Sequence, residues 1–157
     1  MDNKQQLMRQ AIAAAMSNVK NNTGGPFGAV IVKDGQIIAY GKNAVTTTND
    51  PTAHAEVVAI REACKILGSF QLTGCELYTS CEPCPMCLGA IYWARPDRVY
   101  YACTQQDAAL AGFDDAFIYE EIDLPAQQRK IPFEQLLRNE SQTVFDEWNK
   151  SREKIPY

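Results

Sequence analysis

The chain has no long hydrophobic run and no cluster of Lys and Arg, and both absences restrict what it can be. Because no apolar stretch reaches about 20 residues, we expect no membrane-spanning helix, and the polar residues 1–6 argue against a secretory signal. A protein that holds a nucleic-acid backbone usually needs a basic stripe, yet the formal net charge is −4. These features favour a cytoplasmic protein that binds a small molecule, with no nucleic acid and no membrane as a partner.

Histidine is also scarce, whereas cysteine is not. The 157 residues include a single histidine, His54, and six cysteines. Thiols stay reduced in the cytoplasm, so we interpret the cysteines as metal ligands or buried small residues and not as disulfides. Cys84 and Cys87 form a C-x-x-C pair, which indicates metal binding. The cysteines outside this pair are Cys64, Cys75, Cys81 and Cys103.

The order of apolar and polar residues predicts one α/β domain over residues 1–157, a length that suits a single hydrophobic core. Asp34-Gly35 between two apolar runs indicates a hairpin, and Ser141 is predicted to cap a last helix. Helical spacing and strand-like runs together predict a three-layer α-β-α arrangement with a mixed five-stranded sheet. The expected helices are 4–20, 53–67, 85–94 and 141–152, and the expected strands are 27–32, 37–41, 75–79, 98–102 and 133–137.

His54, Cys84 and Cys87 carry the imidazole and thiolate groups that zinc prefers as ligands. The histidine falls at the start of one predicted helix, and the two cysteines flank the first turn of another. A spacing of three places both sulfurs on one helical face, and a helix N-terminus favours the thiolate. Three protein ligands leave the fourth tetrahedral position of a zinc ion for water, which is typical of a catalytic site. We therefore predict one Zn2+ per subunit.

Glu56 is the candidate catalytic residue. It follows His54 by two positions, so its carboxyl group can face the metal without binding it. Zinc lowers the pKa of bound water toward neutrality, and a carboxyl group that cycles between acid and base can move the protons of a hydrolysis. The combination predicts a hydrolytic enzyme.

Two other interpretations of these residues stay open. Cys81 lies three residues before Cys84, so these cysteines with Cys87 and His54 would make a closed zinc site in a non-enzymatic interaction module. That interpretation leaves Glu56 without a role, and Cys81 is expected to end a strand. Alternatively, the single histidine is a core residue bonded to backbone, which leaves the cysteine pair unexplained.

Longer segments around these residues extend the pattern. His54-Ala55-Glu56 together with Pro83-Cys84-Pro85-Met86-Cys87 matches the H-x-E and P-C-x-x-C signature of zinc deaminases. Over essentially the whole chain the sequence resembles the cytidine-deaminase-like superfamily, and more closely its small bacterial guanine deaminases. The other segments that carry the resemblance are 24–29, 49–53, 79–82, 91–96 and 111–115, with the terminal Tyr157.

The resemblance implies a reaction and an assembly. The reaction would be guanine plus water giving xanthine plus ammonia, with attack at C2 of the base and Glu56 protonating N3 and then the leaving amine. Family members look like homodimers that exchange their C-terminal segment, here about residues 130–157, so each active site would be shared between two subunits.

The resemblance also implies a set of substrate contacts from separated parts of the chain. A ring at the start of a strand could stack on a flat purine, and an amide could pair with the base edge. A carboxylate in the long loop 105–125 could accept hydrogen bonds from the N–H groups of guanine, and Asp115 is preferred there over its neighbour Asp114. The expected contacts are Phe27, Asn43, Ala55, Asp115 and Tyr157.

Other substrates would keep the same chemistry. Cytosine, a purine nucleoside or adenosine in tRNA are the alternatives to guanine. The acidic balance argues against tRNA, and a lid formed by the C-terminal segment would exclude the sugar of a nucleoside.

Overall fold

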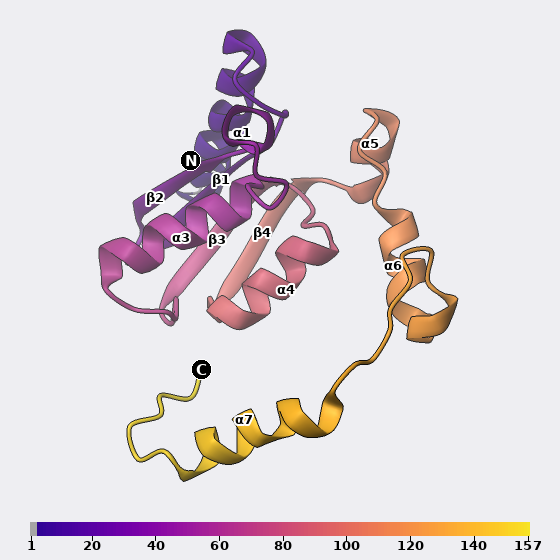
Figure 1. Cartoon of the computed structure of the whole chain (residues 1–157). Coiled ribbons are helices and arrows are strands. Elements are labelled where there is room, and N and C mark those ends of the chain that lie inside the picture. The colour runs from indigo at the N-terminus through magenta and orange to yellow at the C-terminus, as the bar shows by residue number, and fades with distance from the viewer. Residues whose placement is uncertain (1–2) are drawn as a thin grey trace. The chain divides into compact units, whose positions relative to one another are not determined.

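The computed structural model describes residues 3–157, which form two compact units. The first unit ends at Asp115 and contains a sheet with helices on both of its faces, and the second spans Ala116–Tyr157 and is helical (Figure 1). Across the described residues, no helix is both long and apolar enough to cross a membrane.

The sheet of the first unit has four strands in the order β2-β1-β3-β4. β1 runs antiparallel to β2 and β3, whereas β3 and β4 are parallel, so the sheet is mixed as predicted. The predicted hairpin is confirmed: Asp34 and Gly35 join β1 to β2, and both adopt positive φ angles, 50° and 75°. The strands are β1 (Gly28–Lys33), β2 (Gln36–Lys42), β3 (Cys75–Cys81) and β4 (Arg98–Cys103).

Helices cover both faces of this sheet and give the predicted three layers. α1 (Asn3–Asn21) packs on one face, where Leu7 and Ala11 meet Val30, Val32 and Tyr78. α3 (Ala55–Leu67) packs on the other face, and α4 (Pro85–Ala94) lies against α3. The core on this side contains Ala29, Ile31, Ala55, Ala59, Leu77 and Ile91.

Glycine allows α3 to approach the sheet closely. A Cβ atom on Gly41 of β2 would collide with the carbonyl oxygen of Ala55, at the start of α3. This close packing fixes the distance between the sheet and the first turn of α3. Because Ala55 follows His54 directly, it also fixes the position of His54.

Short helices complete the chain. α2 (Val45–Thr48) follows β2, and α5 (Gln105–Leu110) begins with a capping box between Thr104 and Asp107. The second unit contains α6 (Ala116–Asp123), the 3-10 helix η1 (Ala126–Gln128) and α7 (Arg138–Lys150).

Two sequence predictions about the second unit are wrong. The described residues hold four strands and not five, because residues 133–137 pair with no other strand, and a strand needs such a partner. Ser141 does not cap the last helix, since its N–H already donates to the carbonyl of Leu137 inside α7. The helix begins at Arg138, three residues earlier than predicted.

Candidate metal and catalytic site

His54 is held at the N-terminus of α3 by a tight polar loop. It is the N-cap residue of this helix, and the loop before it is closed by Asp50, whose Oδ1 accepts from the N–H and the hydroxyl of Thr52 at 2.8 and 2.7 Å. These bonds to Thr52 lower the pKa of Asp50. Arg61 of α3 reaches the same carboxylate at 3.4 Å, which ties the loop to the helix that it precedes.

Cys84 and Cys87 occupy the first turn of α4, which follows directly on the end of β3. Cys84 is the N-cap residue, Pro85 takes the first helical position, and the N–H of Leu88 closes the turn on the carbonyl of Cys84 at 2.8 Å. The start of α4 therefore lies just past the end of β3, and its N-terminus favours negatively charged groups.

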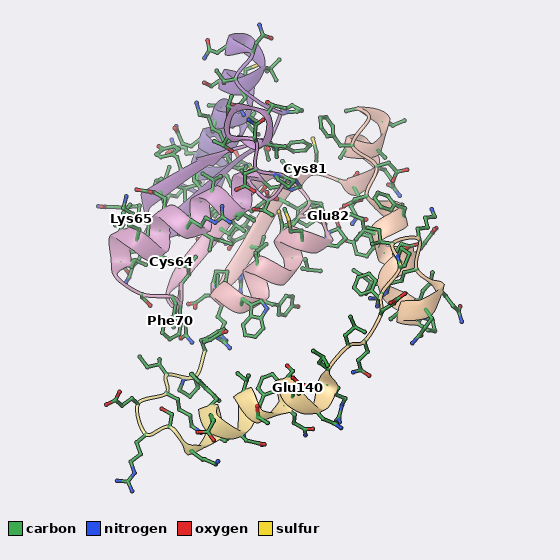
Figure 2. The ribbon with its side chains drawn as sticks, in the orientation of Figure 1. Cys64, Lys65, Phe70, Cys81, Glu82 and Glu140 are labelled. Atoms are coloured by element: carbon green, nitrogen blue, oxygen red, sulfur yellow. The ribbon has the colours of Figure 1, made fainter. Side chains whose placement is uncertain are left out.

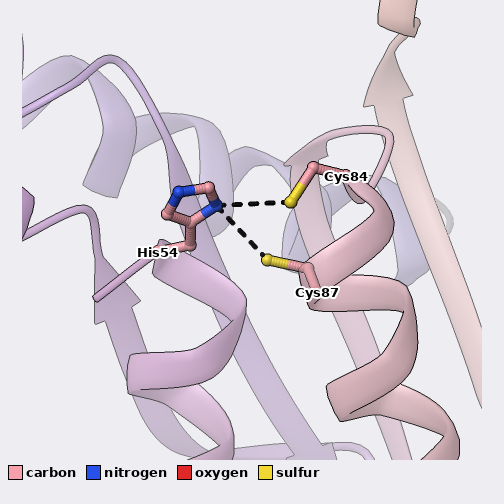
Figure 3. A group of neighbouring side chains, drawn as sticks. All are labelled: His54, Cys84 and Cys87. Carbon is pink, nitrogen blue, oxygen red and sulfur yellow. Dashed lines mark hydrogen bonds between the residues drawn. The ribbon is translucent and has the colours of Figure 1, made fainter. Parts of the chain in front are cut away.

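The structure brings the three predicted metal ligands together (Figure 3). The Sγ atoms of Cys84 and Cys87 each lie 3.5 Å from Nδ1 of His54, and the ligand atoms of all three lie within 4.8 Å of one another. With zinc bonds of about 2.1 Å to nitrogen and 2.3 Å to sulfur, a tetrahedral site requires an N···S separation of about 3.6 Å. The observed distances match the edges of that tetrahedron, so these residues fit a zinc ion.

Cys81 is not part of this group. It is the last residue of β3 (Figure 2), and its thiol donates to the carbonyl of Thr104 at 3.5 Å. Burial raises the pKa of Cys81 to about 11, which disfavours the thiolate that zinc requires. Among residues 3–157, the ligand group contains His54, Cys84 and Cys87 alone, so the closed four-ligand site is not formed.

The electrostatics of the group favour a cation. A hydrogen bond from the thiol of Cys87, together with the adjacent His54, lowers the pKa of Cys84 to about 4. The same bond and burial raise the pKa of Cys87, and the bond to Cys84 raises the pKa of His54. These shifts favour the thiolate form of Cys84, which is the form that binds zinc.

Glu56 lies beside this group in the first turn of α3 and is buried. Its Oε2 lies 3.5 Å from the Sγ of Cys87, and its Oε1 lies 3.3 Å from the hydroxyl of Thr79, whose proton is shared between this oxygen and the carbonyl of Cys81 at 3.1 Å. Burial raises the pKa of Glu56, as is typical of carboxyl groups that exchange protons in enzymes. Sequence reasoning missed Thr79, because nothing in a buried strand marks which residue will face the carboxylate.

Two of the predicted substrate contacts lie in adjoining segments. Phe27 is half-buried, and the ring of Phe113 packs edge-on against it with a centroid distance of 4.9 Å. The Oδ1 of Asn43 accepts from the N–H groups of Gly25 and Val45, both at 3.3 Å. Within residues 3–157, the Nδ2 of Asn43 donates to no protein acceptor, so the amide offers a donor to a ligand. Phe113 was not among the predicted contacts.

The other three predicted substrate contacts are Ala55, Asp115 and Tyr157, and they lie in separate parts of the chain. Ala55 is fully buried at the start of α3, where its side chain packs in the core. Burial and the charge of Cys84 raise the pKa of the half-buried Asp115, whereas Asp114 is exposed. The preference for Asp115 as a base contact stays a prediction. Tyr157 belongs to the second unit and is exposed, so its predicted role is not tested.

The other cysteines follow the prediction of buried small residues only in part. Cys75 is buried and Cys64 is half-buried, but Cys103 is exposed. Cys103 ends β4, a strand at the sheet edge whose residues are largely accessible. None of the six cysteines, all within the described residues, forms a disulfide.

Comparison with known proteins assigns the chain to a family. The chain is 60% identical over 155 residues to guanine deaminase from Bacillus subtilis, with 99% of each chain covered. The crystal structure of guanine deaminase from Bacillus subtilis superposes with a TM-score of 0.95, covering 98% of both chains. The tRNA-specific adenosine deaminase of Aquifex aeolicus is 37% identical over 80% of each chain. Residues 1–103 match the family described as the cytidine and deoxycytidylate deaminase zinc-binding region, and the chain belongs to this family.

Proposed function

We propose that this chain is a zinc-dependent guanine deaminase that converts guanine and water to xanthine and ammonia. The observation that carries the proposal is the arrangement of His54, Cys84 and Cys87 at zinc-ligand distances, with the buried carboxyl group of Glu56 beside them. The similarity to the Bacillus subtilis guanine deaminase over nearly the whole chain favours guanine among the possible bases.

The three ligands would hold Zn2+, which supplies a Lewis acid able to turn water into a nucleophile near neutral pH. Glu56 then moves the protons. Its carboxylate accepts one proton as water attacks C2 of guanine and delivers it to N3. It then takes the second proton of the same water-derived oxygen and delivers it to the departing amine, which leaves as ammonia. The bond from Thr79 holds one carboxyl oxygen, which leaves the other, on the Cys87 side, to exchange protons.

The base would be recognised by groups of opposite hydrogen-bonding character. Asn43 presents a donor, because its oxygen is occupied by the N–H groups of Gly25 and Val45, and this donor suits an acceptor such as a ring carbonyl. Asp115 presents an acceptor that suits the N–H groups of guanine. Phe27 would stack on the ring, a contact worth about 1–3 kcal/mol at comparable sites.

A second candidate substrate is adenosine in tRNA, because the Aquifex aeolicus relative is a tRNA-specific adenosine deaminase. The formal net charge of −4 and the absence of a basic run disfavour it, since binding to tRNA requires neutralised phosphates. Ultraviolet absorbance of the purified protein with guanine tests the assignment by the appearance of xanthine. Turnover of cytosine, adenine, guanosine or tRNA adenosine in place of guanine would overturn it.

The proposed assembly is a cytoplasmic homodimer whose subunits exchange the segment of about residues 130–157 and share each active site. Two features support it. Tyr92 and Trp93 of α4 are 75% and 61% exposed, which suits an interface, and α7 buries none of its residues although Phe145 and Trp148 lie on it. The prediction that Tyr157 completes the partner's site rests on this proposal.

Mixing two inactive variants tests the shared site. A homodimer of Glu56→Gln lacks the proton carrier in both sites, and a homodimer without Tyr157 lacks the lid residue in both. If the segments are exchanged, a mixed dimer assembles one site with both defects and one intact site, so activity returns on mixing under conditions that allow subunit exchange. Activity that stays at the sum of the two variants, in a mixture shown to contain mixed dimers, would exclude a site completed by the partner.

A further inference from the structure

Asn18 is a polar residue on the apolar face of α1. Leu7, Ala11 and Ala15 form the buried stripe of this helix, and Asn18 continues it at helical spacing with only 1% of its surface exposed. A buried amide is unfavourable unless its donors and acceptor are all bonded, so the position calls for a specific set of partners.

The side chain of Asn18 has those partners, and they lie in two segments. Its Nδ2 donates to the carbonyl of Asn43 at 2.7 Å and to the carbonyl of Gly25 at 3.0 Å. Its Oδ1 accepts from the hydroxyl of Thr23 at 3.0 Å. One side chain therefore joins α1, the loop 22–27 and the residue that follows β2.

These two segments carry the proposed base contacts. Gly25 accepts from the N–H of Phe27 at 2.8 Å, and Phe27 in turn accepts from the N–H of Asn43 at 3.1 Å. The N–H of Gly25 also donates to Oδ1 of Asn43, which turns the Nδ2 of that amide outward. A Cβ atom on Gly24 would collide with the carbonyl of Asn43, so the backbones meet too closely for any side chain there.

We propose that Asn18 is a positioning residue for base recognition, which acts through Asn43 and Phe27 and does not touch the substrate. The proposal rests on the proposed function, because it assigns Asn18 a part in binding the purine base. Because Asn18 bonds the carbonyls of Gly25 and Asn43, it fixes the position of the Phe27 ring relative to the side-chain amide of Asn43.

This role predicts a particular kinetic signature. Asn18 has no hydrogen bond to His54, Cys84, Cys87 or Glu56, so the chemical step does not depend on it directly. Loss of its two donated bonds should therefore raise KM and leave kcat and zinc content nearly unchanged. A residue that only stabilised the fold would lower the melting temperature without selectively raising KM.

The experiment measures kcat and KM for guanine with Asn18→Ala and with Thr23→Val as the matched control. Asn18→Ala removes both donated bonds, and we expect KM to rise about tenfold or more, with kcat changed less than about twofold. Thr23→Val removes only the bond to Oδ1 and leaves both donations intact, so its KM should stay within about twofold of the wild type. An unchanged KM in Asn18→Ala, or an equal rise in both variants, overturns the proposal.

A double-mutant cycle with Asn43→Ala tests the route of the effect. If Asn18 acts through the Asn43 amide, its replacement should raise KM much less once that amide is gone, whereas full additivity overturns the proposal. Should Asn18→Ala fail to fold, Asn18→Ser serves for the same comparison, because its shorter side chain cannot reach both carbonyls that Nδ2 bonds. Calorimetric binding of 8-azaguanine is then a second measurement. A wild-type protein without activity on guanine overturns the proposed function and this inference with it. An active wild type with an unaffected Asn18→Ser overturns the inference alone.

Discussion

Replacing Glu56 with Gln separates proton transfer from metal binding. Gln has the same shape, and its amide oxygen can still accept from the hydroxyl of Thr79, which lies 3.3 Å from the carboxyl oxygen. Its Nε2 would take the position of Oε2, 3.5 Å from the Sγ of Cys87, and can donate to that sulfur. The buried side chain therefore keeps its contacts, and we expect the fold and the zinc content to stay as in the wild type.

The expected loss is in the chemical step. An amide cannot accept the proton of the attacking water or pass it to the base, and general acid–base catalysis contributes about 10²–10⁴-fold to such reactions. We therefore expect kcat to fall by about 10²–10⁴-fold, equivalent to roughly 3–5 kcal/mol of transition-state stabilisation. KM should change far less, because Glu56 is not among the proposed groups that bind the base.

Three measurements on the same preparation check this prediction. Xanthine formation is followed by ultraviolet absorbance, zinc by elemental analysis, and the fold by the melting temperature. Retention of more than about a tenth of the wild-type kcat with full zinc would refute the assignment of Glu56 as the proton carrier. Loss of zinc in Glu56→Gln would instead show that the carboxylate holds the metal, contrary to the ligand geometry.

Three further predictions follow from the site. Cys84→Ser should lose zinc on purification, whereas Cys81→Ser should keep about one zinc per chain, because only the former removes a ligand. Elemental analysis of both variants distinguishes the open site from a closed site of three cysteines and one histidine. Asp115→Asn should raise KM for guanine about tenfold or more, whereas Asp114→Asn, at the exposed neighbouring position, should leave KM near the wild-type value. Steady-state kinetics in which Asp114→Asn has the larger effect on KM would contradict the choice of Asp115. Thr79→Val should lower kcat about tenfold at full zinc content, because it removes a hydrogen bond to the Glu56 carboxyl group. An unchanged kcat together with an unchanged pH–rate profile would argue against a role of Thr79 in orienting that carboxyl group.

The zinc group could be predicted from the sequence because its geometry is set locally. Cys84 and Cys87 are separated by three positions on one helix turn, and His54 caps the other helix, so short-range spacing already fixes most of the site. Only the packing of α3 beside α4 had to be supplied by the fold. The grouping of the three ligands and the positions of the first four strands along the chain were consequently predicted correctly.

Features that depend on contacts between segments far apart in the sequence could not be predicted from local spacing. Thr79 faces Glu56 because β3 and α3 pack together, and no spacing in the sequence connects residues 23 positions apart on different elements. Residues 133–137 include apolar residues typical of a strand, but a strand exists only where another strand offers a ladder of hydrogen bonds. Ser141 has the side chain of a cap, yet the helix backbone already continues on its N-terminal side.

The zinc motif by itself does not select a substrate, since the chain is similar both to a guanine deaminase and to a tRNA-specific adenosine deaminase. Selection must come from groups outside the motif. The amide of Asn43 is oriented by two backbone N–H groups that occupy its oxygen, so it is a candidate donor for such selection. Discrimination would therefore depend on the backbone of residues 22–27 and 43–45, which Asn18 holds from the opposite side of the loop.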